Sequence, residues 1–212
     1  MIKFLEMKPK LINWESAEEH KNKLVLKTIC NDRPISIYKS SYIDEPENGC
    51  DLEISIFTAW FTDKKEKLAS IDINTFFHLG FDDWYSLFAD ADNQSGHFGE
   101  MIEEVFFNED DYECVDLKYN IEEYDYVVYL SNLKIDENFR GNGFGKHLIN
   151  CISDFVRNCP YEVMYSVKPC PTEIDYEKEK ERYNLEKERI ISIYQSCGFK
   201  RVNQSNIFIF NF

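Results

Sequence analysis

The chain has 212 residues, of which 43% are hydrophobic and 16% aromatic, and its formal net charge is -15. This content of core-forming side chains excludes a disordered or fibrous protein, and the length allows a core without disulfide or metal staples. The excess of carboxylates argues against direct binding of nucleic acid or of anionic lipid headgroups.

The amino-terminal half predicts β-structure. Four segments rich in β-branched and aromatic residues are separated by turn signals such as Asn31-Asp32-Arg33-Pro34. The segments are residues 24–30, 35–39, 52–61 and 68–73. Their simplest arrangement is an antiparallel meander.

A change to helical periodicity follows. Between residues 81 and 107, apolar side chains recur every three or four positions after Ser95, which can cap a helix. This predicts an amphipathic helix. From residue 100 to 125 there are eleven carboxylates and one basic residue, Lys118, and such a run is usually a solvated face.

The carboxyl-terminal half alternates strands and helices. Residues 126–135 predict a buried central strand, and an apolar stripe that begins at Phe144 predicts a helix ending near residue 158. A strand over 161–167 precedes a charged helix over 172–196. The buried stripe of that helix is expected at every seventh residue, namely Tyr176, Tyr183, Ile190 and Cys197. A terminal hairpin follows, and its apolar run 207–210 either completes its own sheet or pairs with a second subunit.

Seven cysteines form no C-x-x-C pair, which indicates reduced, mostly buried thiols. His147 and Cys151 lie one helical turn apart, but no second pair accompanies them, so no metal site is predicted. Residues 1–14 lack the apolar run of a signal peptide, and no window reaches the roughly 18 apolar residues of a membrane span. We therefore expect a cytoplasmic protein without a membrane partner.

Three of the eight glycines fall between Gly141 and Gly145. A glycine cluster between a strand and a helix exposes backbone N–H groups at the positive end of the helix dipole, which is a geometry that binds phosphate. A Walker A loop is excluded, because Arg140 stands where its first Gly is required and His147 where it needs Ser or Thr. The G-x-G-x-G spacing, two-thirds along the chain, also argues against a dinucleotide-binding Rossmann site.

The run Arg140-Gly141-Asn142-Gly143-Phe144-Gly145 resembles the acetyl-CoA signature of the GNAT superfamily of N-acetyltransferases, Arg/Gln-x-x-Gly-x-Gly/Ala. In that superfamily a helix, a strand and a second helix follow, and the second helix ends in Tyr-x-x-x-Gly-Phe before a final hairpin. Here that element is Tyr194-Gln195-Ser196-Cys197-Gly198-Phe199, and the order and offsets agree over residues 126–212. The Asp-rich stretch 88–95 and Pro169-Cys170-Pro171 further resemble a bacterial and phage GNAT group.

The resemblance implies an α/β (α+β) fold: a GNAT-like mixed, mostly antiparallel central sheet flanked by helices, with splayed central strands forming an acetyl-CoA cleft. It implies one domain over residues 1–212, with 1–125 on the acceptor side and 126–212 forming the acetyl-CoA-binding core and the C-terminal hairpin. Acetyl-CoA would be the co-substrate, and a primary amine would attack it directly in a ternary complex. A cationic acceptor suits the acidic chain, the acceptor's identity stays open, and both a monomer and a homodimer are compatible.

The resemblance also implies the site residues. Backbone groups of Leu133, Lys134 and Ile135 would pair with the pantetheine amides. Arg140, Gly141, Asn142, Gly143, Phe144, Gly145 and Lys146 would hold the pyrophosphate. Tyr194 would protonate the departing thiolate. The alternative is that it only packs in its helix, but its place four residues before Gly198-Phe199 favours the catalytic role.

The proton acceptor is the open part of this site. An amine of pKa about 10.4 is protonated at neutral pH, and exposing its lone pair near pH 7.4 costs about 4 kcal/mol, so a base is expected. Many relatives carry a Glu on the central strand, but this chain has Ser131-Asn132 there. The substitutes are Glu122, Glu123 and Asp125, or a water held by Ser131 and Asn132.

Two other functions stay open. One is a catalytically inactive GNAT-shaped protein that acts through its acidic surface, as a DNA mimic or an inhibitor of a basic partner, and the absent strand Glu favours it. The other is a toxin-like acetyltransferase acting on aminoacyl-tRNA, against which the net charge argues. The glycine cluster and Tyr194 favour the N-acetyltransferase, because a mimic needs neither.

Overall fold

The computed structural model describes residues 14–16, 23–44, 52–62, 66–77, 92, 96–106, 124–158, 162–171, 173–202 and 204–210. These residues form one nine-stranded sheet with the order β1-β2-β3-β4-β5-β6-β7-β9-β8. The strands are β1 (Trp14–Ser16), β2 (Lys23–Cys30), β3 (Arg33–Asp44), β4 (Leu52–Phe61), β5 (Glu66–Phe77), β6 (Tyr126–Ile135), β7 (Val163–Val167), β8 (Phe199–Arg201) and β9 (Phe208–Phe210). Neighbouring strands are antiparallel except β6 and β7, which run parallel.

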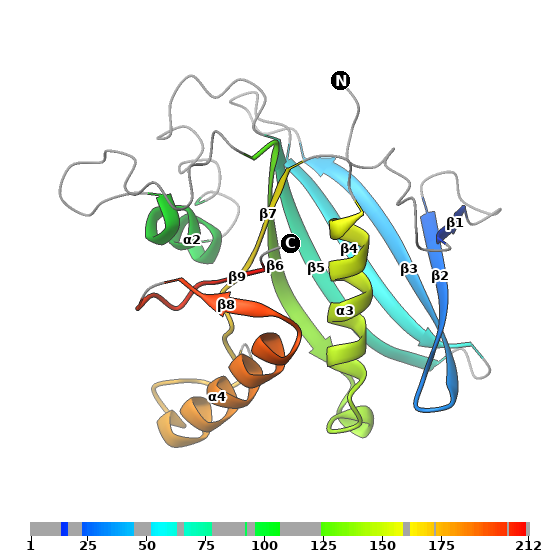
Figure 1. Cartoon of the computed structure of the whole chain (residues 1–212). Helices are drawn as coiled ribbons and strands as arrows, with labels where there is room; N and C mark the ends of the chain where they lie inside the picture. Colours follow the sequence, from blue (N-terminus) through cyan, green and yellow to red (C-terminus); the bar gives the residue numbers. More distant parts are fainter. Residues whose placement is uncertain are drawn as a thin grey trace.

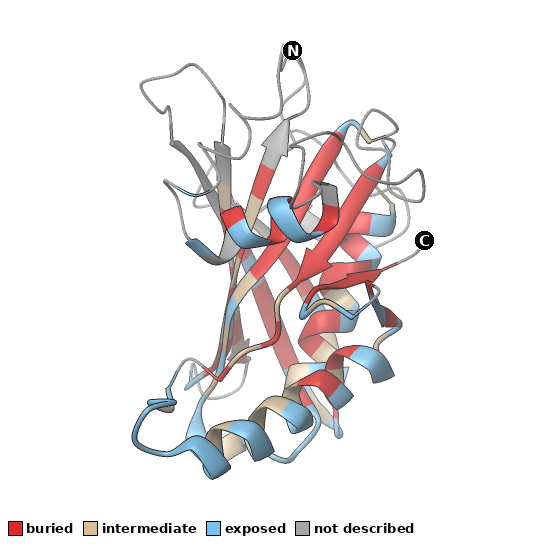
Figure 2. Cartoon of the chain, turned by 90° about the vertical axis from the view of Figure 1, so that its left-hand side faces the viewer, coloured by how far each residue is buried: buried red, intermediate tan, exposed pale blue. Residues whose placement is uncertain are grey.

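Three α-helices of more than ten residues flank the sheet in the part of the chain that the structure describes. They are α2 (Gly96–Phe106), α3 (Phe144–Arg157) and α4 (Lys180–Ser196), and a 3-10 turn, η3 (Glu137–Phe139), precedes α3. Figure 1 and Figure 2 show α2 and α3 on opposite faces of the sheet. The predicted mixed, mostly antiparallel sheet with flanking helices is confirmed.

The core lies between α3 and the sheet. Alternate side chains of β5 and β6, such as Ile71 and Val128, are fully buried against the apolar face of α3, where Leu148 and Ile152 are buried in turn. Phe155 of α3 contributes an edge-on contact, with its ring centroid 5.8 Å from that of a β4 phenylalanine. Burying each such side chain stabilises the fold by roughly 1.5–3 kcal/mol. This packing fixes α3, and with it the glycine cluster at its start.

The strands of the meander agree with the sequence, but two are longer than predicted. β3 covers residues 33–44 rather than 35–39, and β5 covers 66–77 rather than 68–73. Hydrophobic patterning underestimates these strands because their polar ends still pair with neighbours in the ladder, as Thr75 does with Glu53. The terminal hairpin is confirmed, and β9 lies between β7 and β8, so the apolar run 207–210 completes its own sheet.

Two expectations about α4 differ from the structure. The helix begins at Lys180 rather than 172, because the Asp175 carboxylate accepts hydrogen bonds from the N–H groups of Glu177 and Lys178 and holds a separate turn. The seven-residue stripe is buried only in part: Tyr176 precedes the helix and is 43% exposed, whereas Ile190 and Cys197 are half-buried and pack against the core. The fully buried residues of α4 are Ile191 and Tyr194.

Several predictions fall outside the described residues. The acidic run is described only at 100–106 and 124–125, so Glu122 and Glu123 are not placed, nor is most of the Asp-rich stretch 88–95. Of the seven cysteines, Cys30, Cys151, Cys170 and Cys197 are described, and they are free. Among the described helices, none has the length and apolarity needed to cross a membrane.

Candidate functional site

β6 and β7 pair along only the first half of β6. Their register ends with Leu130 opposite Val167, while β6 continues to Ile135 beside β5. Beyond Val167 the chain contains Pro169 and Pro171, which have no N–H group with which to extend a ladder. The two strands therefore separate, and the far half of β6 is left with one strand partner in the described register.

A bulge interrupts the other edge of β6 at the same level. Asn132 has φ +50°, a left-handed conformation that Asn tolerates better than most residues. The register with β5 shifts here, because Asp72 pairs with Ser131 and Ser70 pairs with Lys134. The bulge brings the Asn132 side chain to Asp72, where Nδ2 donates a hydrogen bond to Oδ2 at 3.2 Å.

The glycine cluster forms the turn into α3. Gly141 and Gly143 have φ +78° and +76°, and a Cβ built on either one has nothing within 4 Å. Gly143 is the N-cap of α3 and makes no side-chain cap, and the first helical bond runs from the His147 N–H to the Gly143 carbonyl at 3.0 Å. The N–H groups of residues 144–146 thus have no partner within the helix. They lie at the positive end of the helix dipole, an arrangement suited to an anion.

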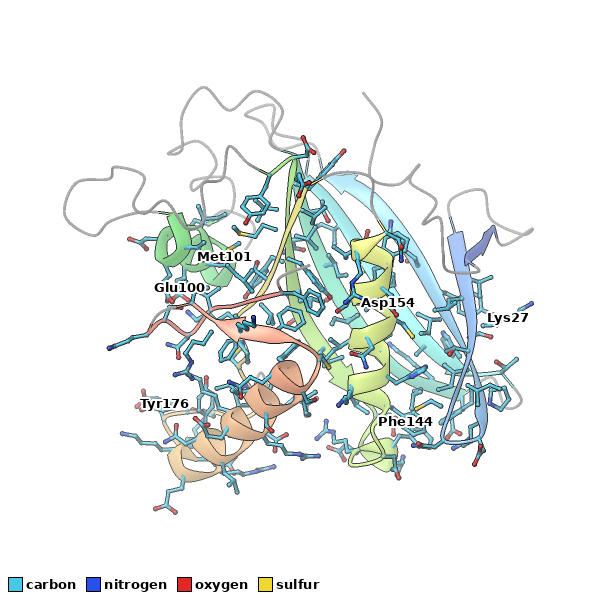
Figure 3. The ribbon with its side chains drawn as sticks, in the orientation of Figure 1. Lys27, Glu100, Met101, Phe144, Asp154 and Tyr176 are labelled. Carbon is cyan, nitrogen blue, oxygen red and sulfur yellow. The ribbon has the colours of Figure 1, made fainter. Side chains whose placement is uncertain are left out.

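A cleft of about 1190 Å³ lies in front of this turn. Its walls are the ends of β5 and β6, the segment from η3 into α3, and one face of α4. Nine of the ten predicted donor-binding residues line it: Leu133, Lys134, Ile135, Arg140, Gly141, Gly143, Phe144, Gly145 and Lys146. Tyr194 lines it from the α4 side. Figure 3 shows Phe144 at the start of α3, at the lower end of the sheet.

Asn142, the tenth predicted residue, lies outside this lining. Its side-chain Nδ2 donates to the carbonyls of Phe139 and Arg140 at 3.3 and 3.2 Å. Its own carbonyl accepts a hydrogen bond from the Asn31 side chain at 2.5 Å, in the β2–β3 turn. These contacts lie outside the cleft lining and hold the glycine turn in place.

The cleft carries more positive than negative charge, in contrast to the whole chain. Its lining includes six basic residues, Lys67, Lys134, Arg140, Lys146, Arg182 and Arg189, and four acidic residues, Asp136, Glu137, Glu173 and Glu186. Arg140 joins two walls: its Nη2 donates to Glu173 Oε2 at 2.6 Å and its Nε donates to the Ile135 carbonyl at 3.1 Å. The local field of the lining favours an anionic ligand.

Tyr194 lies at the apolar inner end of the cleft. It is 4% exposed, and its ring packs edge-on against Phe199 with centroids 5.4 Å apart. Burial, followed by the neighbouring groups Tyr129 and Cys197, raises the pKa of Tyr194 well above that of an exposed tyrosine. The hydroxyl therefore stays protonated at neutral pH and can donate a hydrogen bond.

A polar row occupies the sheet face away from α3, beside the point where β6 and β7 separate. Asp72 and Asn74 of β5 lie opposite Ser131 and Tyr129 of β6, and paired residues share a face. Glu104 of α2 is near enough to help raise the pKa of Tyr129, which burial raises most. Sequence reasoning missed Asp72, although its place between the buried Ile71 and Ile73 signals a side chain on the opposite face.

Lys168 neutralises part of the acidic surface of α2. Its ammonium forms an ion pair with Glu100 and lies 4.0 Å from Glu104, and its side chain is only 15% exposed. Glu100 lies on the side of α2 that is turned toward the β8–β9 hairpin (Figure 3). The predicted substitute base Asp125 is instead at the start of β6, where its carboxylate accepts the Glu162 N–H at 3.0 Å.

His147 and Cys151 make structural contacts. His147 Nε2 lies 3.3 Å from Thr28 Oγ1 and 3.7 Å from Cys151 Sγ, and burial lowers the pKa of His147. Among the described residues, no group of three or more His, Cys, Asp or Glu side chains is arranged to hold a metal ion.

Neither a protein-family model nor a curated protein matches the chain. Among solved structures it is similar to the apo form of an agmatine N-acetyltransferase mutant, with 14% identity and a TM-score of 0.41. It is also similar to a polyamine N-acetyltransferase of Drosophila melanogaster, with 14% identity and a TM-score of 0.42. Both alignments cover 70% of this chain and 59% of the other.

A third similar structure is Arabidopsis thaliana NAA60 in complex with acetyl-CoA. The identity is 14%, the TM-score is 0.38, and the alignment covers 74% of this chain and 75% of that one. Similarity this distant assigns neither an activity nor a substrate to this chain.

Proposed function

We propose that the protein is an acetyl-CoA-dependent N-acetyltransferase that transfers an acetyl group to a primary amine. The observation that carries the proposal is the cleft itself. A glycine turn at the start of α3, an edge of β6 with no strand partner among the described residues and a buried tyrosine hydroxyl line one continuous space, and this arrangement supports acetyl-CoA as the ligand. The GNAT-like motifs at Arg140–Gly145 and Tyr194–Phe199 support the same function.

The donor would lie along the cleft with its phosphates at the glycine turn. The free N–H groups of residues 144–146 would bind the pyrophosphate, with Lys146 and Arg140 nearby. The backbone of Leu133, Lys134 and Ile135 would bind the pantetheine amides as an added strand does. The thioester would then reach the point where β6 and β7 separate, next to Tyr194.

Tyr194 would act on the leaving group. Its hydroxyl can donate a hydrogen bond to the sulfur as negative charge develops there, because burial keeps the proton on the oxygen. We expect Tyr194→Phe to lower kcat about a hundredfold with unchanged affinity for acetyl-CoA. Unchanged turnover in this variant would limit Tyr194 to a packing role.

Asp72 would take the proton from the amine in place of the missing strand carboxylate. It pairs with Ser131 of the Ser131-Asn132 segment, where many relatives carry their Glu, and its carboxylate accepts a hydrogen bond from Asn132. Asp72→Asn keeps an oxygen for the Asn132 hydrogen bond but removes the base, so kcat should fall. The fall should shrink for acceptor amines of low pKa, which need no base. Glu66→Gln, an exposed carboxylate on the same strand, is the matched control.

The first experiment is isothermal titration of the purified protein with acetyl-CoA, with CoA and ATP as controls. Binding of acetyl-CoA in the micromolar range, followed by acetylation of members of an amine library, is the expected result. A folded protein that binds no acetyl-CoA would refute the proposal. That outcome would favour the second candidate, an inactive protein that binds a basic partner through its acidic surface.

A further inference from the structure

The face of α4 that lines the cleft changes character along its length. Its residues recur at helical spacing on one side of the helix: Arg182, Leu185, Glu186, Arg189, Ile190, Ile193 and Tyr194. The last three are apolar or buried and belong to the inner end. The first four belong to the outer end, where the side chain of Leu185 is 77% exposed between two arginines. The outer end of this face therefore offers an apolar contact and two guanidinium groups at the edge of the cleft.

Both arginines are held in place and still accessible. Arg182 donates to Glu179 at 2.6 Å and Arg189 donates to Glu186 at 3.4 Å, while their side chains remain 68% and 50% exposed. A guanidinium has five N–H donors, so most donors of each remain for a ligand. The two residues are seven positions apart, which is about 10 Å along the helix, and long side chains can meet over one ligand group from that distance.

The opposite wall of the cleft is close to this part of α4. The pKa of Arg182 is raised first by its hydrogen bond to Glu179 and additionally by Glu137 of η3, which belongs to the other wall. The outer end of α4 therefore faces the segment that leads into the glycine turn. Both arginines line the same cleft as the glycine turn.

We propose that Arg182, Leu185 and Arg189 bind the 3′-phosphoadenosine end of the donor and select 3′-phosphorylated acetyl-CoA. This inference rests on the proposed function. Acetyl-CoA carries two separate anionic groups, and the glycine turn accounts for the pyrophosphate. The 3′-phosphate needs further cations, and guanidinium groups bind phosphate with paired hydrogen bonds. Leu185 offers the purine an apolar surface, and an arginine can stack on its face.

The test compares two donors that differ only in the 3′-phosphate, acetyl-CoA and acetyl-dephospho-CoA. Calorimetric titrations are made on the wild type, on the Arg182→Gln/Arg189→Gln double variant, and on Arg157→Gln. Arg157 is the matched control, because it pairs with Asp154 three residues earlier on α3, in the same manner, and lies outside the cleft lining. Circular dichroism and melting curves establish that each variant is folded.

The wild type and the control should bind acetyl-CoA about tenfold more tightly than acetyl-dephospho-CoA, which corresponds to about 1.4 kcal/mol. The double variant should bind the two donors equally. Equal affinity of the wild type for both donors would overturn the inference and leave the proposed function standing. A double variant whose affinity for both donors falls by the same factor would also overturn the inference and leave the proposed function standing. Absence of acetyl-CoA binding to the wild type would refute the proposed function itself.

Discussion

Two glycine substitutions should separate binding of the donor from stability of the fold. Gly143→Ala adds a methyl group in the glycine turn, at φ +76° with no atom within 4 Å of the new Cβ. Gly198→Ala adds one after α4, at φ +106° with the new Cβ 3.0 Å from Phe210 Cε2. The first position lines the cleft and the second does not.

The structure sets the expected magnitudes. Gly143→Ala has only the left-handed backbone to oppose it, so it should destabilise by about 1 kcal/mol, which lowers Tm by roughly 2–4 °C. Gly198→Ala adds overpacking, because Phe210 is held between Tyr165 and Phe199 with ring centroids 6.0 and 5.2 Å away. Its cost should be about 3 kcal/mol or more.

Binding should show the opposite order. Gly143 lines the cleft, so a methyl group added there should compete with a phosphate oxygen for the space in front of the N–H groups at the start of α3. Loss of one charge-assisted hydrogen bond, at roughly 1.5–3 kcal/mol, weakens acetyl-CoA binding about tenfold to a hundredfold. Gly198→Ala should keep the wild-type Kd below its Tm. Scanning calorimetry and isothermal titration measure the two effects, and wild-type affinity in Gly143→Ala would falsify the assignment of the glycine turn as the phosphate site.

Three further outcomes are expected. Burial raises the pKa of three tyrosines, Tyr129, Tyr165 and Tyr194. In the unfolded chain these tyrosines ionise at about pH 10, so the free energy of unfolding should be unchanged below that pH. Above it, the free energy of unfolding should fall by up to about 4 kcal/mol per pH unit. Urea denaturation at pH 9 and 11 would reveal or exclude this fall. Burial also raises the pKa of the Cys170 thiol, so iodoacetamide should label it slowly at neutral pH and faster in alkali. Peptide mapping should show that acetyl-CoA protects this thiol, which lines the cleft, and does not protect Cys197, which lies outside the lining. Glu173→Gln releases Arg140 from its ion pair and should strengthen acetyl-CoA binding up to about fivefold. Calorimetric titration measures this effect, with Glu177→Gln as the control. Weaker binding in Glu173→Gln would mean that the ion pair helps to form the site.

Local patterns predicted the elements on which the site depends. The strand at 126–135 has the predicted bounds, because its buried β-branched residues contrast with the polar residues around it. The helix start after Gly143 follows from glycine chemistry alone. Contacts between distant segments could not be read in this way. The ion pair between Arg140 and Glu173 joins residues 33 positions apart and depends on how the loops before α3 and α4 approach each other.

Asp72 illustrates the same limit. Alternation in β5 indicates that its side chain leaves the core, but its neighbour on β6 depends on the register between two strands almost 60 residues apart. The bulge at Asn132 sets that register, and a left-handed Asn within a strand gives no periodic signal. The sequence of β6 alone shows Ser131 and Asn132 where a carboxylate is expected, and it gives no sign of a carboxylate on a neighbouring strand. In the proposed function the carboxylate is Asp72, on the adjacent strand.

The distribution of charge explains how an acidic chain could serve an anionic donor and a cationic acceptor. A surface of one sign attracts one of these substrates and repels the other. Here the cleft lining has six basic and four acidic residues, although the chain as a whole carries -15, so the surplus of carboxylates lies outside the cleft. Screening limits each field to about 8 Å at physiological ionic strength, which lets two regions of opposite sign act on different substrates. A protein that only bound a basic partner through its acidic surface would need the outer field alone. Such a function would give the basic lining of the cleft no role, whereas an anionic donor requires it.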